Sequence, residues 1–359
     1  METTAGGAFL PRGRDSDCIL INSPYCFDAG DERVHVFPGL TALHTLFVRF
    51  HNYIADEFKF STNWDDETIF QETRKIIAAF MQKITYKDFL PEVLNSATRG
   101  RFGLDGPYRY DIHTDPSIAN SFATAAYRFG HSLIPDFFII NGTKVQTRKL
   151  FNDPQYIFNS FDQVVDNILT NQAEVLDRFL TLEITDHLFE FGDISFDLAS
   201  FNIQRGRDHG LPPYNDFREW CGLPRVRSFY SSIFGRLGPS MSRLYNHVDE
   251  LDLFTGAMSE RDEPGSAVGP VLSCLLGQQF HDLKHGDSFW YETQEQRRGF
   301  TSDQLAAIQK TSFASILCNQ FDRQYIQTNP FRVVSNSNPL VECQSLPHFD
   351  MSPWLPNRK

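Results

Sequence analysis

The chain has 359 residues and a formal net charge of −12, with 41% hydrophobic and 22% charged residues. This balance is typical of a globular protein with a sizeable core and excludes a disordered chain. The acidic charge argues against a general nucleic-acid binder, which needs cationic side chains to neutralise phosphates. No apolar run approaches the roughly 20 residues that cross a bilayer, so the sequence predicts no transmembrane helix.

The cysteines and one sequon favour an oxidising compartment. An even number of cysteines is compatible with three disulfides, and Asn141-Gly142-Thr143 is a possible glycosylation site. The amino terminus, in contrast, lacks the basic start and apolar stretch of a signal peptide. A secreted-looking chain without a secretory start is expected to be N-terminally incomplete. The six cysteines are Cys18, Cys26, Cys221, Cys274, Cys318 and Cys343.

The first predicted elements are two long helices. Residues 1–38 show no regular period and are expected to form a loop, and Pro38-Gly39 then opens a helix whose apolar residues recur at 3- and 4-residue steps. A second helix is predicted after Asp65-Asp66-Glu67, because acidic residues suit a helix N-terminus. Short helical pieces over 86–94 and a turn-rich break over 100–110 follow. The expected apolar stripe of the first helix is Leu40, Leu43, Phe47, Ile54 and Phe58.

The rest of the chain is also predicted to be mostly helical. A helical pattern resumes over 116–134, where Pro135 is expected to end it, and Asn141-Gly142 predicts a short hairpin. The last 30 residues are expected to be coil with at most one strand. We therefore expect one mainly α domain over residues 1–359, with little β. Further helices are predicted over 161–179, 196–206, 214–221, 241–250, 267–284 and 302–309.

Common catalytic signatures are absent from the sequence. It carries no dinucleotide or P-loop glycine pattern, no G-x-S-x-G and no H-E-x-x-H. His281 and His285 are four residues apart and could share a metal ion, but the sequence favours two surface histidines flanking Lys284. His44 and His51, seven apart in the first predicted helix, are interpreted as packing residues at the edge of its stripe.

Three segments are unusual enough to suggest a site. GDER over 30–33 precedes the first helix, and YRFGHSLI over 127–134 places His131 beside Gly130 in an apolar, aromatic helix. A planar cofactor could lie there with His131 as its axial ligand, although these eight residues alone favour a hydrogen-bonded core histidine. NIQRGRDHG over 202–210 is dense in charge beside apolar residues, which suggests a buried polar network or a structural salt-bridge cluster.

Taken in order, these segments resemble the animal haem peroxidase family, in its myeloperoxidase and peroxidasin branch. The resemblance extends from about Phe9 to Trp354 and matches roughly the C-terminal two thirds of a family catalytic domain. It implies a mainly α, animal haem-peroxidase-like helical domain that is N-terminally incomplete. The motifs that carry it are GDER, PGLTALHTLFVRFHNYIADEF, WDDETIFQETRKII, ITYKDFLPEVL, DPSIANSFATAAYRFGHSLI, FDLASFNIQRGRDHGLPPYNDFREWCGL and VGPVLSCLLGQQFHDLKHGDSFWYE.

The resemblance implies roles for four residues. His131 matches the proximal ligand of the haem iron, and Asn202 matches the asparagine that accepts the other imidazole N–H, which makes the ligand more electron-donating. Arg33 matches the distal catalytic arginine, which polarises the peroxide O–O bond. Arg205 resembles a partner of a haem propionate. The family's loop closures also imply three disulfides, Cys18–Cys26, Cys221–Cys274 and Cys318–Cys343.

The sequence departs from the family in three places. The distal histidine, a general acid–base worth about 10²–10⁴-fold in rate, its neighbouring aspartate and the calcium loop all lie upstream of the first residue. Calcium is therefore expected for the family, but no residue here matches its loop. Val36 stands where the family's haem-linking glutamate falls, and Phe37 where a methionine can follow it, so haem b without that ester link is expected. Phe50 replaces a glutamate that matters for packing rather than chemistry.

The implied function is a secreted, haem-dependent peroxidase that uses hydrogen peroxide to oxidise a halide or a small phenolic donor such as tyrosine. The alternative is a catalytically inactive, peroxidase-like extracellular scaffold or matrix protein. A haem-binding intracellular protein that starts at Met1 is a third interpretation, which the cysteines and the sequon disfavour. No nucleic-acid partner is expected, and the sequence does not fix the oligomeric state.

Overall fold

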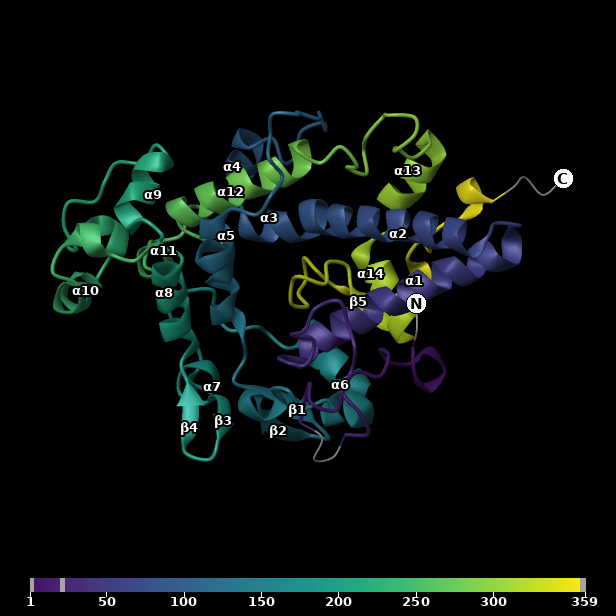
Figure 1. Cartoon of the computed structure of the whole chain (residues 1–359), viewed down its shortest axis with the longest axis horizontal. Coiled ribbons are helices and arrows are strands. Elements are labelled where there is room, and N and C mark those ends of the chain that lie inside the picture. Colours follow the sequence, from purple (N-terminus) through teal and green to yellow (C-terminus); the bar gives the residue numbers. More distant parts are fainter. Residues whose placement is uncertain (1–2, 20–22, 356–359) are drawn as a thin grey trace. The chain divides into compact units, whose positions relative to one another are not determined.

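The computed structural model describes residues 3–19 and 23–355, and it is mainly helical with three two-stranded antiparallel hairpins. Parts of the predicted N-terminal loop and C-terminal coil therefore lie outside the described residues. Contacts between residues group the chain into two compact units. Unit 1 comprises residues 1–88, 137–172 and 294–359, and unit 2 comprises 89–136 and 173–293. The predicted fold class is confirmed (Figure 1), and the organisation as one domain stays a prediction.

Unit 1 is built on two long helices, both predicted from the sequence. Helix α1 begins with Pro38 in its first turn, and the Asp65 side chain accepts the Thr68 N–H at the start of α2. Helix α1 packs against α2, α6 and α14 (Figure 1). The helices and strands are η1 (Ala5–Gly7), α1 (Pro38–Ser61), α2 (Asp66–Lys83), the π-helical η2 (Ile84–Phe89), β1 (Phe137–Ile140), β2 (Thr143–Gln146), η4 (Thr147–Leu150), α6 (Gln155–Thr170), α13 (Ser302–Lys310), α14 (Phe313–Phe321), β5 (Tyr325–Gln327), β6 (Leu340–Glu342), η7 (Cys343–Ser345) and η8 (Ser352–Trp354).

The predicted apolar stripe of α1 is only half right. Ile54 and Phe58 are buried, but Leu43 is 41% exposed. Leu46 and Phe50 are buried instead. Because α2, α6 and α14 all pack against α1, its buried face is wider than the predicted stripe and includes these two positions. The Phe50 ring lies edge-on to Phe80 at 5.2 Å, so this position serves packing.

The Asn141-Gly142 hairpin is confirmed. Both residues have positive φ, 51° and 72°, as the tight turn between β1 and β2 requires. The helix predicted over 161–179 instead begins at Gln155 and ends at Thr170. It stops there because Asn171 caps it and the chain then leaves unit 1.

Unit 2 contains shorter elements around helix α12, which contacts α4, α5, α11 and η3 (Figure 1). The helical pattern predicted over 116–134 splits at Ala125 into α5 and the 3-10 segment η3, and Pro135 follows its end as expected. The β3–β4 hairpin was not predicted. The elements are α3 (Leu90–Val93), α4 (Ser96–Arg101), α5 (Asn120–Thr124), η3 (Ala126–Leu133), α7 (Leu182–Thr185), β3 (Leu188–Phe191), β4 (Ile194–Phe196), α8 (Leu198–Asp208), α9 (Tyr214–Trp220), η5 (Ser232–Phe234), α10 (Gly238–Leu244), η6 (Val248–Glu250), α11 (Leu253–Met258) and α12 (Pro270–His285).

All three expected disulfides are confirmed. Cys18 pairs with Cys26 and Cys318 with Cys343 in unit 1, and Cys221 pairs with Cys274 in unit 2. The last bond joins the end of α9 to α12 and closes a loop of 53 residues, so it removes much freedom from the unfolded chain. None of the helices within 3–19 and 23–355 is long and apolar enough to cross a membrane.

Candidate haem site

The candidate site lies in unit 2, where η3 faces the start of α8. The Asp197 carboxylate accepts the N–H groups of Ala199 and Ser200 and so fixes where α8 begins. This start places Asn202 in the first turns of α8, fully buried at 0% exposure. Arg205 follows about one turn later and is exposed.

His131 and Asn202 are in contact as the resemblance implies, but the donor and acceptor of their hydrogen bond are exchanged. The Asn202 amide N–H donates to Nδ1 of His131 at 2.9 Å, and its carbonyl oxygen accepts from the Arg128 guanidinium at 3.0 Å. Because a guanidinium carries donors only, it selects the oxygen of Asn202 and turns the nitrogen toward the imidazole. The Arg128 Nε also donates to the Ala123 carbonyl oxygen, 3.1 Å away, which fixes the side chain.

The His131 imidazole is neutral at physiological pH. Burial and, to a smaller extent, the nearby charge of Arg128 together lower its pKa to about 4. A neutral imidazole is the form that binds metals. Since Asn202 donates to Nδ1, the ring proton sits on Nε2 in this arrangement. A metal at Nε2 therefore requires the proton to move to Nδ1 and the Asn202 amide to turn.

The segment around His131 leaves room beside Gly130 and presents a neutral imidazole, the form that binds metals. A Cβ added at Gly130 would meet no atom within 4 Å, so the open space that the sequence suggested beside this glycine is present. Within the described part of the chain, the exposed Arg205 side chain on α8 forms no hydrogen bond or ion pair. Phe129 is buried in the core and anchors the segment.

The charged segment 202–210 is not the buried network that the sequence suggested. Asn202 is its one buried member, and the other side chains lie at the surface or half-buried. Arg207 forms a bidentate ion pair with Asp252, in which its Nε and one terminal nitrogen lie 3.0 and 2.6 Å from the two carboxylate oxygens. The salt-bridge interpretation therefore fits Arg207, whose charge is paired with Asp252 while it remains in contact with water.

Arg33 belongs to unit 1, where it pairs with Asp31 through two parallel hydrogen bonds of 2.9 and 2.8 Å. The pairing lowers the pKa of Asp31 to about 2. The Arg33 side chain is 78% exposed. The half-buried Val36 and Phe37 that follow pack locally, and the Phe37 ring lies edge-on to Phe138 at 5.7 Å. A peroxide-binding role for Arg33 requires release from Asp31.

The histidines of the first helix are packing residues, as interpreted from the sequence. His51 is buried, with Nδ1 3.1 Å from the Asn52 side-chain oxygen, and burial lowers its pKa. His44 is half-buried, and burial likewise lowers its pKa. The two rings therefore stay neutral in the interior of unit 1.

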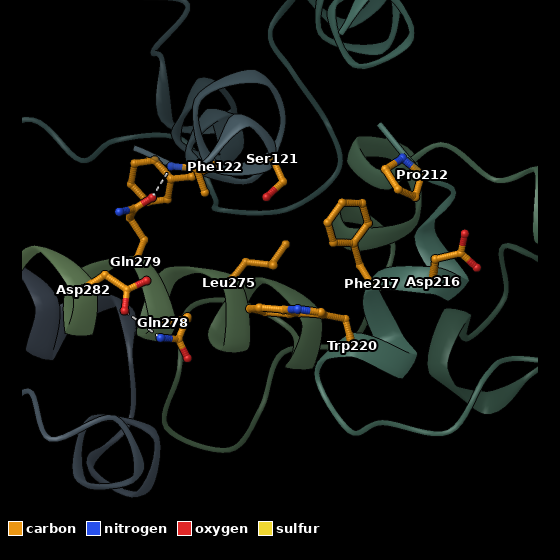
Figure 2. Close-up of a pocket in the computed structure, with 11 residues that line it drawn as sticks. Ser121, Phe122, Pro212, Asp216, Phe217, Trp220, Leu275, Gln278, Gln279 and Asp282 are labelled. Carbon is orange, nitrogen blue, oxygen red and sulfur yellow. Dashed lines mark hydrogen bonds between the residues drawn. The ribbon is translucent and has the colours of Figure 1, made fainter. Parts of the chain in front are cut away.

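A separate cavity of about 430 Å³ opens elsewhere in unit 2, between α5, α9 and α12 (Figure 2). The aromatic rings of Phe217 and Trp220 and the Leu275 side chain line it, and carboxylates lie at both ends in the view of Figure 2. Neither His131 nor Asn202 lines this cavity.

Sequence reasoning assigned no role to Arg128, although this residue sets the orientation of Asn202. One signal was available. Arg128 lies three residues before His131 in an otherwise apolar, aromatic stretch, so a charge there needs a partner close to the imidazole.

Comparisons with known proteins identify the family of the chain. The sequence description of the animal haem peroxidase family matches residues 1–331. Peroxidase-like protein 3 of Lottia gigantea is 46% identical over 290 residues, which cover 80% of this chain and 98% of the relative. Thyroid peroxidase of Sus scrofa is 35% identical over 348 residues, 92% of this chain but 37% of its own length, and a peroxidasin homolog of Mus musculus is 38% identical over 92% of this chain and 23% of its own length.

Solved structures give the same result. Peroxidase A of Dictyostelium discoideum superposes with a TM-score of 0.73 at 28% identity, over 92% of this chain and 62% of that one. A fatty acid alpha-dioxygenase of Oryza sativa shares the fold with a TM-score of 0.71 at 18% identity, over 92% of this chain and 63% of that one. The chain thus spans well under half of the vertebrate relatives it matches. On this evidence, the chain belongs to the animal haem peroxidase family.

Proposed function

We propose that the chain binds haem b through His131 and belongs to a secreted peroxidase that uses hydrogen peroxide to oxidise a halide or a small phenolic donor. The observation that carries this proposal is the buried contact between Asn202 and the neutral His131 imidazole. Haem would supply the redox chemistry of peroxide reduction when bound. Three disulfides and an exposed sequon asparagine, Asn141, support an oxidising compartment.

The chain's own residues would act as follows. Nε2 of His131 would bind the iron, while the Asn202 oxygen, once turned, would accept the Nδ1 proton and strengthen the imidazole as a donor. Arg205 would pair with a propionate, and Arg33, once released from Asp31, would orient the peroxide. Val36 carries no carboxylate, so it offers no ester link to the cofactor. A calcium requirement remains an expectation from the family.

The activity test uses the haem-loaded full chain with hydrogen peroxide and either tyrosine or bromide. We expect donor oxidation that is saturable in peroxide and that falls to the rate of free haemin in His131→Ala. Equal rates in the two proteins would mean that the oxidation comes from loosely bound haem, and would contradict the proposal.

A second candidate is the inactive extracellular scaffold, which one observation favours. Arg33, the residue expected to bind peroxide, is already bound to the Asp31 carboxylate through two hydrogen bonds. Asp31→Asn removes this pairing and separates the candidates. An enzyme held back by Asp31 should gain peroxide turnover in this variant, whereas a scaffold should show none in either form.

Because Asn202 donates to His131 rather than accepting from it, we make a further prediction for the haem-free protein. The proton of His131 should sit on Nε2, because Arg128 holds the Asn202 oxygen. In Arg128→Met the amide is free to turn. Losing a hydrogen bond from a charged group, worth about 1.5–3 kcal/mol, should shift the ratio of the two tautomers by about tenfold or more.

Nitrogen-15 NMR of the histidine rings measures this ratio directly. Arg207→Met is the matched control, because it removes an arginine of α8 that pairs with Asp252 and not with Asn202. A wild-type ring that already carries its proton on Nδ1 would overturn the assignment.

A further inference from the structure

The last turn of α12 carries two histidines that the peroxidase site does not use. His281 and His285 are four residues apart, which places them on one face of the helix. Their ring centroids lie 4.6 Å apart with an angle of 41° between the planes. Both side chains are half-buried, so they are held in place and still reach solvent.

Each ring is oriented by a hydrogen bond at Nδ1. Nδ1 of His281 donates to the Phe102 carbonyl oxygen at 2.9 Å, and Nδ1 of His285 donates to the Arg109 carbonyl oxygen at 2.8 Å. A backbone carbonyl can only accept, so both protons must sit on Nδ1. In the neutral form of each ring, Nε2 therefore keeps its lone pair. A carbonyl bonded to the far nitrogen is also the usual support of a metal-binding histidine.

The segment that supplies these carbonyls is tied to the same helix turn. Lys284 donates to the carbonyl oxygens of Gly103, Leu104 and Gly106 at 3.2, 3.0 and 2.7 Å. These three carbonyl dipoles stabilise the buried ammonium charge and hold the segment against α12. The His285 carbonyl oxygen accepts the Asp111 N–H at 2.8 Å. The two imidazoles are thus presented by a rigid platform, which reduces the entropy cost of binding an ion.

The space and the charge at the pair also suit a cation. Gly103 has a φ of 66°, and a Cβ built there would lie 3.5 Å from Nε2 of His285, so the absence of a side chain keeps this edge of the ring open. The carboxylates of Asp111 and Asp282 both lie within Coulombic range of the His281 ring. Two imidazoles with carboxylates nearby form a donor set typical of borderline transition metals.

We infer that His281 and His285 form a two-histidine binding site for a divalent transition-metal ion of the kind that prefers imidazole, such as Zn²⁺ or Cu²⁺. No group of three or more His, Cys, Asp or Glu side chains within 3–19 and 23–355 is arranged to hold a metal. Two Nε2 atoms are therefore the protein ligands, and water completes the coordination. The site is independent of the proposed haem function, since it shares no residue with it.

The test is calorimetric titration of the metal-stripped full chain with Zn²⁺ alone. We expect one ion per chain. In His281→Asn/His285→Asn, the asparagine nitrogen can still donate to the backbone carbonyls where Nδ1 did, but Nε2 is gone. The Zn²⁺ affinity of this variant should fall by at least about 10–100-fold, which is the usual loss when only a hydrogen-bond partner of a metal ligand is removed. Its melting temperature should stay close to that of the wild type.

His247→Ala is the matched control, because this exposed histidine pairs with Asp249 elsewhere in unit 2. It should bind Zn²⁺ like the wild type. With Cu²⁺ as a second probe, the electron paramagnetic resonance spectrum should show coupling to two nitrogens in the wild type and lose it in the double variant. No binding by the wild type, or equal binding by the double variant, would overturn the inference.

Discussion

Replacing His131 with alanine is expected to abolish specific haem binding. The imidazole is the proposed ligand of the iron, and it is held neutral by burial and contacted by a fully buried amide. Alanine leaves Asn202 and Arg128 paired with each other, but offers no lone pair. The Soret band of the wild-type protein titrated with haemin should therefore be shifted and sharp, and that of the variant should match free haemin.

Asn202→Ala provides a graded comparison. It removes the hydrogen-bond partner of the ligand but keeps the ligand itself, so haem affinity should fall by roughly 10–100-fold, less than in His131→Ala. His209→Ala is the control, because this exposed histidine at the end of α8 pairs with Asn120 and does not contact His131. An undiminished Soret band in His131→Ala would show that the iron is bound elsewhere.

Replacing Glu260 with glutamine is expected to cause the largest loss of stability, about 3–5 kcal/mol. The Glu260 side chain is 0% exposed and binds Arg218 at 2.7 Å, whose side chain is only 4% exposed. The same carboxylate accepts from the Tyr214 hydroxyl at 2.6 Å and from the Val271 N–H at 2.8 Å. Because Val271 lies in the first turn of α12, the carboxylate also complements the positive end of that helix. Glutamine would leave the Arg218 charge buried without its counter-ion.

Urea unfolding of the full chain measures this loss. Glu219→Gln is the control, because that carboxylate is 70% exposed and its pairing with Arg225 should contribute no more than about 1 kcal/mol. A double variant, Glu260→Gln with Arg218→Met, should recover part of the loss, since it no longer buries an unpaired charge. Equal unfolding midpoints for Glu260→Gln and Glu219→Gln would contradict this account of the unit 2 core.

The sequence predicts well the features that depend on neighbours in the chain. The start of α2 follows from Asp65, and the β1–β2 turn follows from Asn141-Gly142, since local hydrogen bonds and backbone preferences decide both. The disulfides and the His131–Asn202 contact came from the family resemblance. The Arg33–Asp31 pair is two residues apart and could have been anticipated.

Features that depend on distant partners could not be predicted. Leu43 shares the helical period of the core residues of α1 but stays exposed, because the packing of α2, α6 and α14 decides which face is buried. The sense of the Asn202 hydrogen bond depends on Arg128, 74 residues earlier. The metal-binding potential of the α12 histidines depends on carbonyls of residues 102 and 109, which fix the protonated nitrogen of each ring.

The central claim is that His131 is the axial ligand of the haem, and the most direct measurement combines His131→Gly with added imidazole. Glycine creates a space that free imidazole can fill beside the open face at Gly130. The iron–imidazole stretching band in the resonance Raman spectrum of the reduced, haem-loaded protein should be present in the wild type, absent in the variant and restored by imidazole. A band that persists in His131→Gly without imidazole would contradict the claim.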